Sequence, residues 1–79
     1  MDTTPHPRST VPGAQAIARA ASLLRLVTAA GAAGTSIGDL SRDADLTRPT
    51  VHRLLTALRA EGLVDRDDAS GHWLPGPEL

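Results

Sequence analysis

The 79-residue chain contains no cysteine. Disulfide bridges and zinc sites built from thiolates are therefore excluded. A chain of this length forms one small domain whose core is barely large enough to stabilise a fold. Without disulfides, stability must come from a helical core, from a helix-plus-hairpin core or from a dimer.

The chain also lacks a long apolar run and an apolar N-terminal segment. No stretch approaches the length of a membrane span, and the N-terminus has no signal-peptide core. We therefore expect a cytoplasmic protein with no membrane partner.

Lysine is absent too: the eight basic side chains are all arginine, and the formal net charge is −1. This near-neutral charge argues against general binding to polyanions. The charges are uneven, however, because residues 46–61 carry three arginines and one glutamate, whereas 39–45 carry three aspartates and one arginine. The planar guanidinium of arginine can form two hydrogen bonds to a phosphate or a guanine, which would suit DNA binding. The alternative explanation for the absence of lysine is coding bias in a GC-rich genome.

Residues 1–13 contain three prolines, one glycine and few apolar groups. We expect a disordered tail over 1–13. The alternative is an N-terminal arm whose Arg8 reaches into the minor groove of DNA. The folded domain is predicted over 14–75, and residues 76–79 follow it.

A first helix is predicted over 14–30, followed by the helix-stopping glycines Gly31 and Gly34. Its alanines favour helix. Its apolar residues form an arc broad enough to contact two neighbouring elements: Ile17, Ala20, Leu23, Leu24, Leu26, Val27 and Ala30.

Two further helices are predicted on either side of a tight turn at Asp45. The first covers 37–43 and is capped by Thr35 or Ser36. The second covers about 47–61, with Thr47 as its cap and Pro49 tolerated in its first turn. Gly62 ends it.

The third helix has two contrasting faces. Its apolar residues recur at the i, i+3, i+4, i+7 spacing of a buried face: Val51, Leu54, Leu55 and Leu58. The opposite face is small and mostly polar: Pro49, His52, Arg53, Thr56 and Ala60. We interpret it as a DNA-recognition helix lying in a groove.

The C-terminal part predicts a hairpin, with strands at 63–66 and 72–74 around a polar turn. Leu63 and Trp73 are expected to pack on the helices, because two strands alone are unstable in water. Pro75 is expected to end the pairing. The predicted fold class is mainly α with a small β-hairpin, a winged helix-turn-helix of three helices and a two-stranded wing.

The spacing around the turn supports a helix-turn-helix, in which two helices cross closely. Ser41 is small enough for that approach, and Asp45 stands where glycine is favoured in a left-handed turn. The expected core positions are Leu40, Ala44, Leu46, Val51 and Leu54.

These residues resemble the N-terminal DNA-binding domain of IclR-type bacterial transcription regulators. The matching segments are Ala16–Ala20, Ile37–Leu40, Leu46–Leu58, Glu61–Val64, Gly71–Trp73 and Gly76–Leu79. The resemblance implies a C-terminal effector-binding domain absent from this chain, with residues 76–79 starting the linker to it. A small-molecule effector is expected only through that domain. The sequence departs from the family at Asp45, Pro49 and Pro75, which replace a turn glycine, a polar residue and an apolar strand residue.

The DNA-binding candidates lie mainly on the third helix, and Arg53 is the foremost of them because the resemblance places a DNA-contacting arginine there. The full set is Arg53, Thr50, His52, Arg48, Pro49, Ser36, Thr35, Thr56, Arg19 and Arg66. Plain solvent exposure remains an alternative for the charged members, helix capping for Thr35 and Ser36, and an intersubunit ion pair for Arg19. A core position is favoured for Trp73, and the wing aspartates oppose a phosphate contact from Arg66.

We predict sequence-specific binding to double-stranded DNA, as a homodimer on a palindromic operator. The alternative is a winged helix used for protein–protein contact, which the near-neutral charge permits. No nucleophile–base pair, glycine-rich phosphate loop or metal-ligand spacing is present, so no enzyme activity, cofactor or metal is expected.

Overall fold

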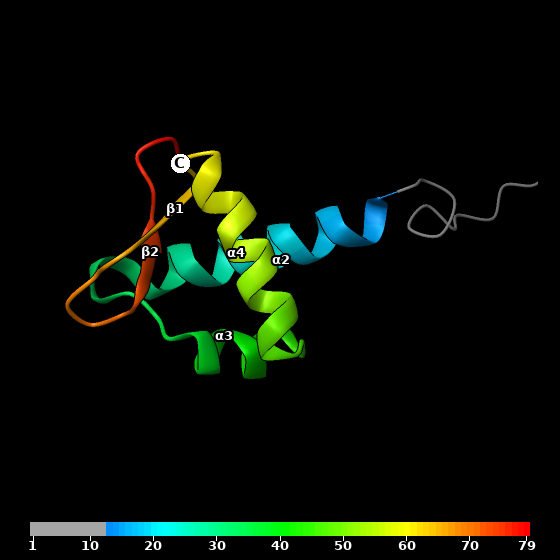
Figure 1. Ribbon diagram of the computed structural model, residues 1–79, viewed down its shortest axis with the longest axis horizontal. Helices are drawn as coiled ribbons and strands as arrows, with labels where there is room; N and C mark the ends of the chain where they lie inside the picture. Colours follow the sequence, from blue (N-terminus) through cyan, green and yellow to red (C-terminus); the bar gives the residue numbers. More distant parts are fainter. Residues whose placement is uncertain (1–12) are drawn as a thin grey trace, which may run out of the picture.

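The structure is a computed structural model that describes residues 13–79. The expected disorder of the tail and the Arg8 arm concern residues 1–12, outside the described part. The elements in chain order are helix α2 (Ala14–Ala30), the 3₁₀ turn η1 (Gly31–Ala33), helix α3 (Ile37–Ala44), helix α4 (Arg48–Ala60), strand β1 (Val64–Arg66) and strand β2 (Trp73–Pro75). The predicted fold class, three helices and a two-stranded wing, is confirmed (Figure 1).

Helix α2 has the predicted bounds because glycines with positive φ stand at both ends. Gly13 has φ 80° and Gly31 has φ 69°, conformations that cost other residues steric strain. Between them, Leu23 and Val27 are fully buried, and α2 packs against α3, α4 and β2. The C-terminal half of α2 is thus the support for the other elements.

The first turns of α2 differ from the prediction. Ile17 was expected within the buried arc, but its side chain is 68% exposed. The reason is geometric, since α2 has 17 residues and its N-terminal half extends beyond the shorter helices (Figure 1). The apolar arc therefore begins at Ala20, which packs against the core.

One expectation about hydrophobic runs needs correction. Residues 14–33 form a helical stretch of 20 residues that contains an 18-residue window with mean hydropathy 1.3, long and apolar enough to cross a membrane by length and composition alone. A core helix of a soluble protein passes the same test, and α2 supplies Leu23 and Val27 to the core. Length and composition therefore do not distinguish the two cases here.

The junction of α3 and α4 is a helix-turn-helix set by local interactions. Asp45 is left-handed, with φ 56° and ψ 48°, and its N–H donates to the Arg42 carbonyl at 3.3 Å. Leu46 N donates to the Ser41 carbonyl at 3.0 Å, and the Ser41 hydroxyl donates to the Leu46 carbonyl. The predicted left-handed conformation of Asp45 is confirmed. Ser41 was predicted only to be small enough for the helices to cross closely, and the structure adds the bond from its hydroxyl across the turn.

The wing is an antiparallel pair in which Val64, Asp65 and Arg66 face Pro75, Leu74 and Trp73. Pro75 was expected to end the pairing but is part of β2. The flanking bonds run from Asp67 N to the His72 carbonyl and from Gly76 N to the Leu63 carbonyl, at 2.8 and 3.0 Å. Pro75 therefore faces Val64 at a non-hydrogen-bonded position, where its missing N–H leaves no ladder bond unmade.

The core lies where α2, α4 and the wing meet. Its buried residues are Leu23, Val27, Leu40, Val51, Leu55, Leu58, Val64 and Trp73. The core position expected for Trp73 is confirmed, whereas the expected core residues Ala44, Leu46 and Leu54 are only partly buried against it. A backbone bridge between Thr35 and Trp73, which the sequence did not indicate, ties the start of α3 to the wing.

Candidate nucleic-acid interface

Helix α4 exposes the face that its sequence pattern predicts. Val51, Leu55 and Leu58 are buried, and Leu54 is partly buried. All five residues of the opposite face are exposed: Pro49, His52, Arg53, Thr56 and Ala60. The helix is therefore held along one side and presents a compact polar surface along the other.

The N-terminal turn of α4 holds a chain of hydroxyl contacts that ends at Arg53. Thr47 caps the helix, accepting from Thr50 N at 3.4 Å. The Thr47 hydroxyl donates to Thr50 Oγ1 at 3.0 Å, and Arg53 Nη2 donates to the same oxygen at 3.3 Å. Because Thr50 Oγ1 accepts both bonds, its own proton remains for another acceptor. Thr50 and Arg53 thus form one donor group on the outward face.

Arg48 lies against the start of α3. A Cβ built on Gly38 would stand 3.0 Å from Arg48 Nη2. The guanidinium therefore lies next to the backbone of the first turn of α3, a position that the absence of a side chain at residue 38 leaves open. This brings Arg48 close to Ser36 and the N-terminal end of that helix, where backbone N–H groups point outward.

Thr35 and Ser36 take different roles. Ser36 caps α3, with Asp39 N donating to its hydroxyl oxygen at 3.0 Å. Thr35 exchanges two backbone bonds with Trp73, at 3.0 and 2.8 Å, so its backbone belongs to the wing. Of the two predicted caps, Ser36 is the one that the structure bears out.

The charges on α3 and α4 are separated more sharply than the net charge suggests. Arg42 pairs with Asp39 at 3.2 Å and Asp43 at 3.1 Å, and the hydrogen bond to Asp43, followed by the Coulombic attraction of both carboxylates, raises the pKa of Arg42. Within residues 13–79, neither Arg48 nor Arg53 has a carboxylate partner. Two arginines at the start of α4 are therefore available to an anion.

The wing turn is organised by Asp67. Its carboxylate accepts from the hydroxyl and the backbone N of Ser70 at 2.7 and 3.2 Å, and the Ser70 hydroxyl bond contributes most to lowering the pKa of Asp67. His72 Nδ1 lies 3.2 Å from the Ala33 carbonyl, so its ring folds back toward η1. In the wing, Arg66 is the predicted residue that lines a pocket shared with α4.

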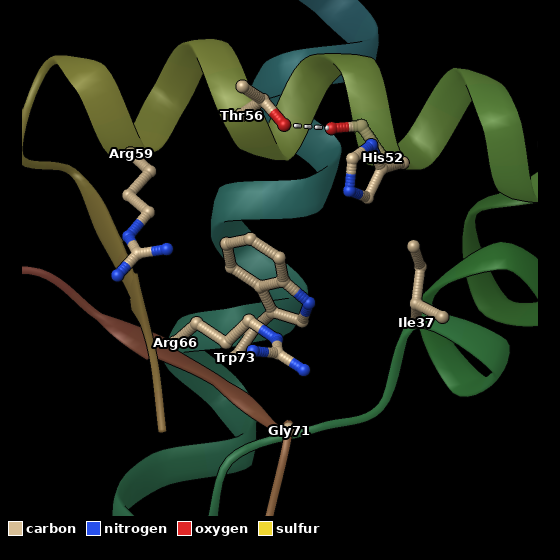
Figure 2. A pocket seen from close by; sticks show the side chains of 7 residues that line it. All are labelled: Ile37, His52, Thr56, Arg59, Arg66, Gly71 and Trp73. Carbon is tan, nitrogen blue, oxygen red and sulfur yellow. Dashed lines mark hydrogen bonds between the residues drawn. The ribbon is translucent and has the colours of Figure 1, made fainter. Parts of the chain in front are cut away.

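Arg59 was missing from the predicted set. It shares a pocket between α4 and the wing with three residues that were in it, His52, Thr56 and Arg66 (Figure 2). The i, i+4, i+7 spacing of His52, Thr56 and Arg59 was the available signal, because it places all three on one side of a helix. The Thr56 hydroxyl donates to the His52 carbonyl at 2.8 Å and so is already occupied.

Arg19 stands apart from these groups. It is exposed on α2 and lines a depression beside the turn residues Ala44 and Leu46. The predicted candidates thus fall into three sets: the α4 face with the start of α3, the pocket against the wing, and the isolated Arg19.

This fold, with an exposed polar face on the second helix of the helix-turn-helix, defines a winged helix-turn-helix domain. The chain belongs to the IclR helix-turn-helix domain family, whose model matches residues 16–68. It is 40% identical over 65 residues to the glycerol operon regulatory protein of Streptomyces coelicolor and 38% identical over 65 residues to that of Streptomyces griseus. It is 45% identical over 67 residues to an HTH-type transcriptional regulator of Mycobacterium tuberculosis.

These matches cover most of this chain but a small part of each relative. They span 82%, 82% and 85% of the chain, and 25%, 25% and 26% of the three relatives in the same order. The chain therefore spans about a quarter of the length of the curated relatives it matches. The family resemblance inferred from the sequence is confirmed, and the chain carries the helix-turn-helix domain of that family. The matched proteins are named as regulators, in keeping with the expectation that this chain is not an enzyme.

Proposed function

We propose that this chain reads a specific DNA sequence for a bacterial transcription regulator, with α4 in the major groove and the wing over the adjacent backbone. The observation that carries the proposal is the Thr50–Arg53 donor group, which stands on the exposed face of a helix buried along its other side. A major groove admits one α-helix, and base edges there offer distinct acceptor patterns to arginine and threonine.

The start of α3 supports a phosphate contact beside that groove. Arg48 lies against the first turn of α3, where Ser36 caps the helix. A backbone phosphate would meet a guanidinium and helix N-terminal N–H groups together. Thr35 and Pro49 flank this region and help to shape it, and a proline at position 49 offers apolar contact in place of a hydrogen bond.

We propose further that the domain acts as a homodimer on a palindromic operator. One module of this size makes few base contacts, and specific affinities of about 10⁻⁸ to 10⁻¹¹ M usually need two half-sites. The small-molecule effector would act through a domain outside this chain, whose match covers only 25% of the glycerol operon regulatory protein of Streptomyces coelicolor. In that arrangement Arg19, away from the α4 face, is better placed for a subunit contact than for DNA.

Selection of binding sites from random duplexes tests the proposal. We expect enrichment of one motif, and a palindrome with half-sites one or more helical turns apart if the dimer proposal is right. Recovery of unenriched duplexes would reject sequence-specific reading, and a single unrepeated motif would reject the dimer.

The rival function, a winged helix that binds protein, gives a different response to salt. Each phosphate contact steepens the fall of log affinity with log salt by about 0.9. We expect a steep slope for the selected duplex. A flat slope, or no binding to any duplex, would favour the protein-contact alternative.

A further inference from the structure

A pocket of about 380 Å³ lies between one side of α4 and the wing (Figure 2). Its α4 side is built by His52, Thr56 and Arg59, and the wing contributes Arg66 and Trp73. The remaining lining residues are Ile37 and Gly71. Elements far apart in the sequence thus bring two arginines and a histidine around one cavity.

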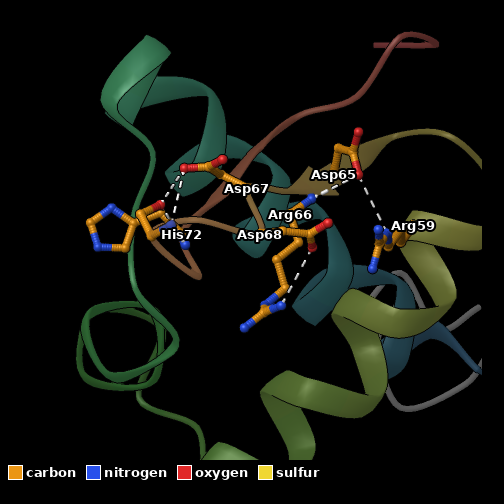
Figure 3. Close-up of polar contacts among 7 residues, drawn as sticks. Arg59, Asp65, Arg66, Asp67, Asp68 and His72 are labelled. Atoms are coloured by element: carbon orange, nitrogen blue, oxygen red, sulfur yellow. Dashed lines mark hydrogen bonds and ion pairs between the residues drawn. The ribbon is translucent and has the colours of Figure 1, made fainter.

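The charge of this pocket has one sign. Among the described residues, those that line it include Arg59 and Arg66 but no carboxylate. Asp65 and Asp68 lie outside the lining, where Asp65 pairs with Arg59 and Asp68 pairs with Arg66 (Figure 3). A cavity lined by cations and free of carboxylates is suited to an anion.

The ion pairs that hold the arginines are easily exchanged. Arg59 Nε lies 3.3 Å from Asp65 Oδ1, with the two side chains 48% and 55% exposed. Arg66 Nη1 lies 3.8 Å from Asp68 Oδ1, and Asp68 is 89% exposed. Pairs this exposed contribute little to stability. Because Arg59 uses Nε for its aspartate, and its terminal nitrogens have no partner within residues 13–79, its fork is available for a phosphate.

The neutral residues of the pocket fix the position of the cations. Trp73 is 5% exposed and lines the pocket together with Arg59 and Arg66 (Figure 2). Gly71 has φ 77°, and a Cβ there would stand 3.2 Å from Arg66 Nη2. The glycine therefore permits both the left-handed turn and the close passage of the guanidinium.

We infer that this pocket binds a backbone phosphate of DNA, on the ridge between the groove that α4 enters and the groove beneath the wing. The inference rests on the proposed function. His52 and Thr56 belong both to the exposed face of α4 and to the pocket lining, so the pocket opens beside the reading face. The DNA strand that borders this groove would then pass Arg59 and Arg66. These two arginines would exchange their ion pairs with Asp65 and Asp68 for a contact with a phosphate.

Substitution of Arg59 tests this assignment with the 79-residue chain, a selected duplex and a scrambled one. We expect Arg59→Ala to weaken both duplexes by the same factor, about threefold to tenfold, and to reduce the salt slope by about 0.9. Arg25→Ala is the matched control, because Arg25 is exposed on α2 and does not line the pocket. It should change neither quantity.

Asp65 provides a second variant with the opposite effect. Asp65→Asn removes the carboxylate that competes for Arg59, so DNA binding should tighten about twofold to threefold. In the Arg59→Ala background the same change should have a much smaller effect, because the gain runs through Arg59. An equal gain in DNA affinity in both backgrounds would mean that Asp65 acts only by general charge repulsion. It would reject the proposed exchange of the Asp65 carboxylate for a phosphate at Arg59.

Two other results would overturn the inference. Unchanged duplex binding by Arg59→Ala would reject the DNA phosphate, and a loss confined to the selected duplex would mean that Arg59 reads bases. An NMR titration with inorganic phosphate distinguishes a DNA phosphate from free phosphate. If the Nε resonances of Arg59 and Arg66 shift saturably while Arg59→Ala leaves duplex binding unchanged, the pocket binds free phosphate instead of DNA. If the wild-type chain binds no duplex, the proposed function is rejected. If added phosphate also leaves the Arg59 and Arg66 resonances unshifted, the pocket is not an anion site.

Discussion

Arg53 Nη2 lies 3.3 Å from Thr50 Oγ1, one turn closer to the start of α4. The same oxygen accepts the Thr47 hydroxyl, so the capping residue, Thr50 and Arg53 form a continuous chain. A guanidinium held in this way loses less rotamer freedom when it binds, and pre-organisation of this kind favours affinity. The helix cap and Arg53 are therefore coupled through Thr50.

This coupling makes Arg53 and Thr50 the first residues to test. We expect Arg53→Ala to weaken binding to the selected duplex by roughly 1–3 kcal/mol and to relax selectivity at one position. Arg53→Lys should recover little of this loss, because an ammonium lacks the bidentate fork. Quantitative duplex titration with single-base variants measures both effects, and an Arg53→Ala variant with unchanged affinity and site preference would remove Arg53 from the interface.

Thr50→Val keeps the shape of the side chain and removes its hydroxyl. We expect a smaller loss than for Arg53→Ala, because the guanidinium stays but its hydrogen-bonded support is gone. The double variant should lose less than the sum of the two single losses, since the residues act together. Strict additivity would show that Thr50 does not act through Arg53.

The left-handed residue at the α3–α4 turn gives a stability prediction. Asp45 has φ 56°, which costs a non-glycine residue strain. Asp45→Gly should change the free energy of unfolding by about +0.5 to +1 kcal/mol, and Asp45→Ala by roughly −1 kcal/mol. Urea unfolding followed by Trp73 fluorescence measures both. A glycine variant less stable than the alanine variant would contradict the left-handed conformation of residue 45.

Ser36 and Thr35 are adjacent but should respond differently to truncation. Ser36→Ala removes the hydroxyl that accepts from Asp39 N and should cost about 1 kcal/mol of stability. Thr35→Ala should cost less, because the bonds of Thr35 to Trp73 are made by its backbone. Equal losses would contradict the assignment of the cap to Ser36.

Ile17 and Leu55 contrast an exposed and a buried apolar residue. Leu55 is fully buried, so Leu55→Ala should cost about 2–5 kcal/mol, enough to unfold much of a domain this small. Ile17→Ala should stay within about 0.5 kcal/mol of wild type, because the side chain is 68% exposed. Thermal unfolding by circular dichroism compares them, with Leu55→Val as a milder core variant if Leu55→Ala does not fold. A loss at Ile17 above that margin would show that the side chain is covered in solution.

The wing turn has a pH dependence set by Asp67. The hydrogen bonds from Ser70 lower the pKa of its carboxyl below the ordinary 3.8. The contribution of this group to stability is therefore present above that value and is lost as the pH falls through the lower folded-state pKa. Carboxyl-carbon NMR should show a midpoint for Asp67 that rises toward the ordinary value in Ser70→Ala. Identical midpoints in the two proteins would contradict the role of the Ser70 hydroxyl.

Much of the fold could be predicted from local sequence because its signals are local. Glycines with positive φ stand at the two ends of α2, and Thr47 caps α4. Asp45 and Ser41 together close the turn between α3 and α4. Each of these depends on residues within five positions of one another, and the periodicity of α4 separates its buried and exposed faces in the same way. The family resemblance was also visible in contiguous segments, and the match over residues 16–68 confirms it.

What the sequence by itself determined, then, is the set of elements, the turn that joins α3 to α4, and the outward position of Arg53. The tertiary structure alone decided that Thr35 bridges Trp73, that Ile17 extends beyond the core, and that Arg59 meets Arg66 across a pocket. The physical reason is the range of the interactions. Caps, turns and helical faces depend on neighbours in the chain, whereas a pocket or a bridge depends on which distant surfaces remain in contact once the core has packed.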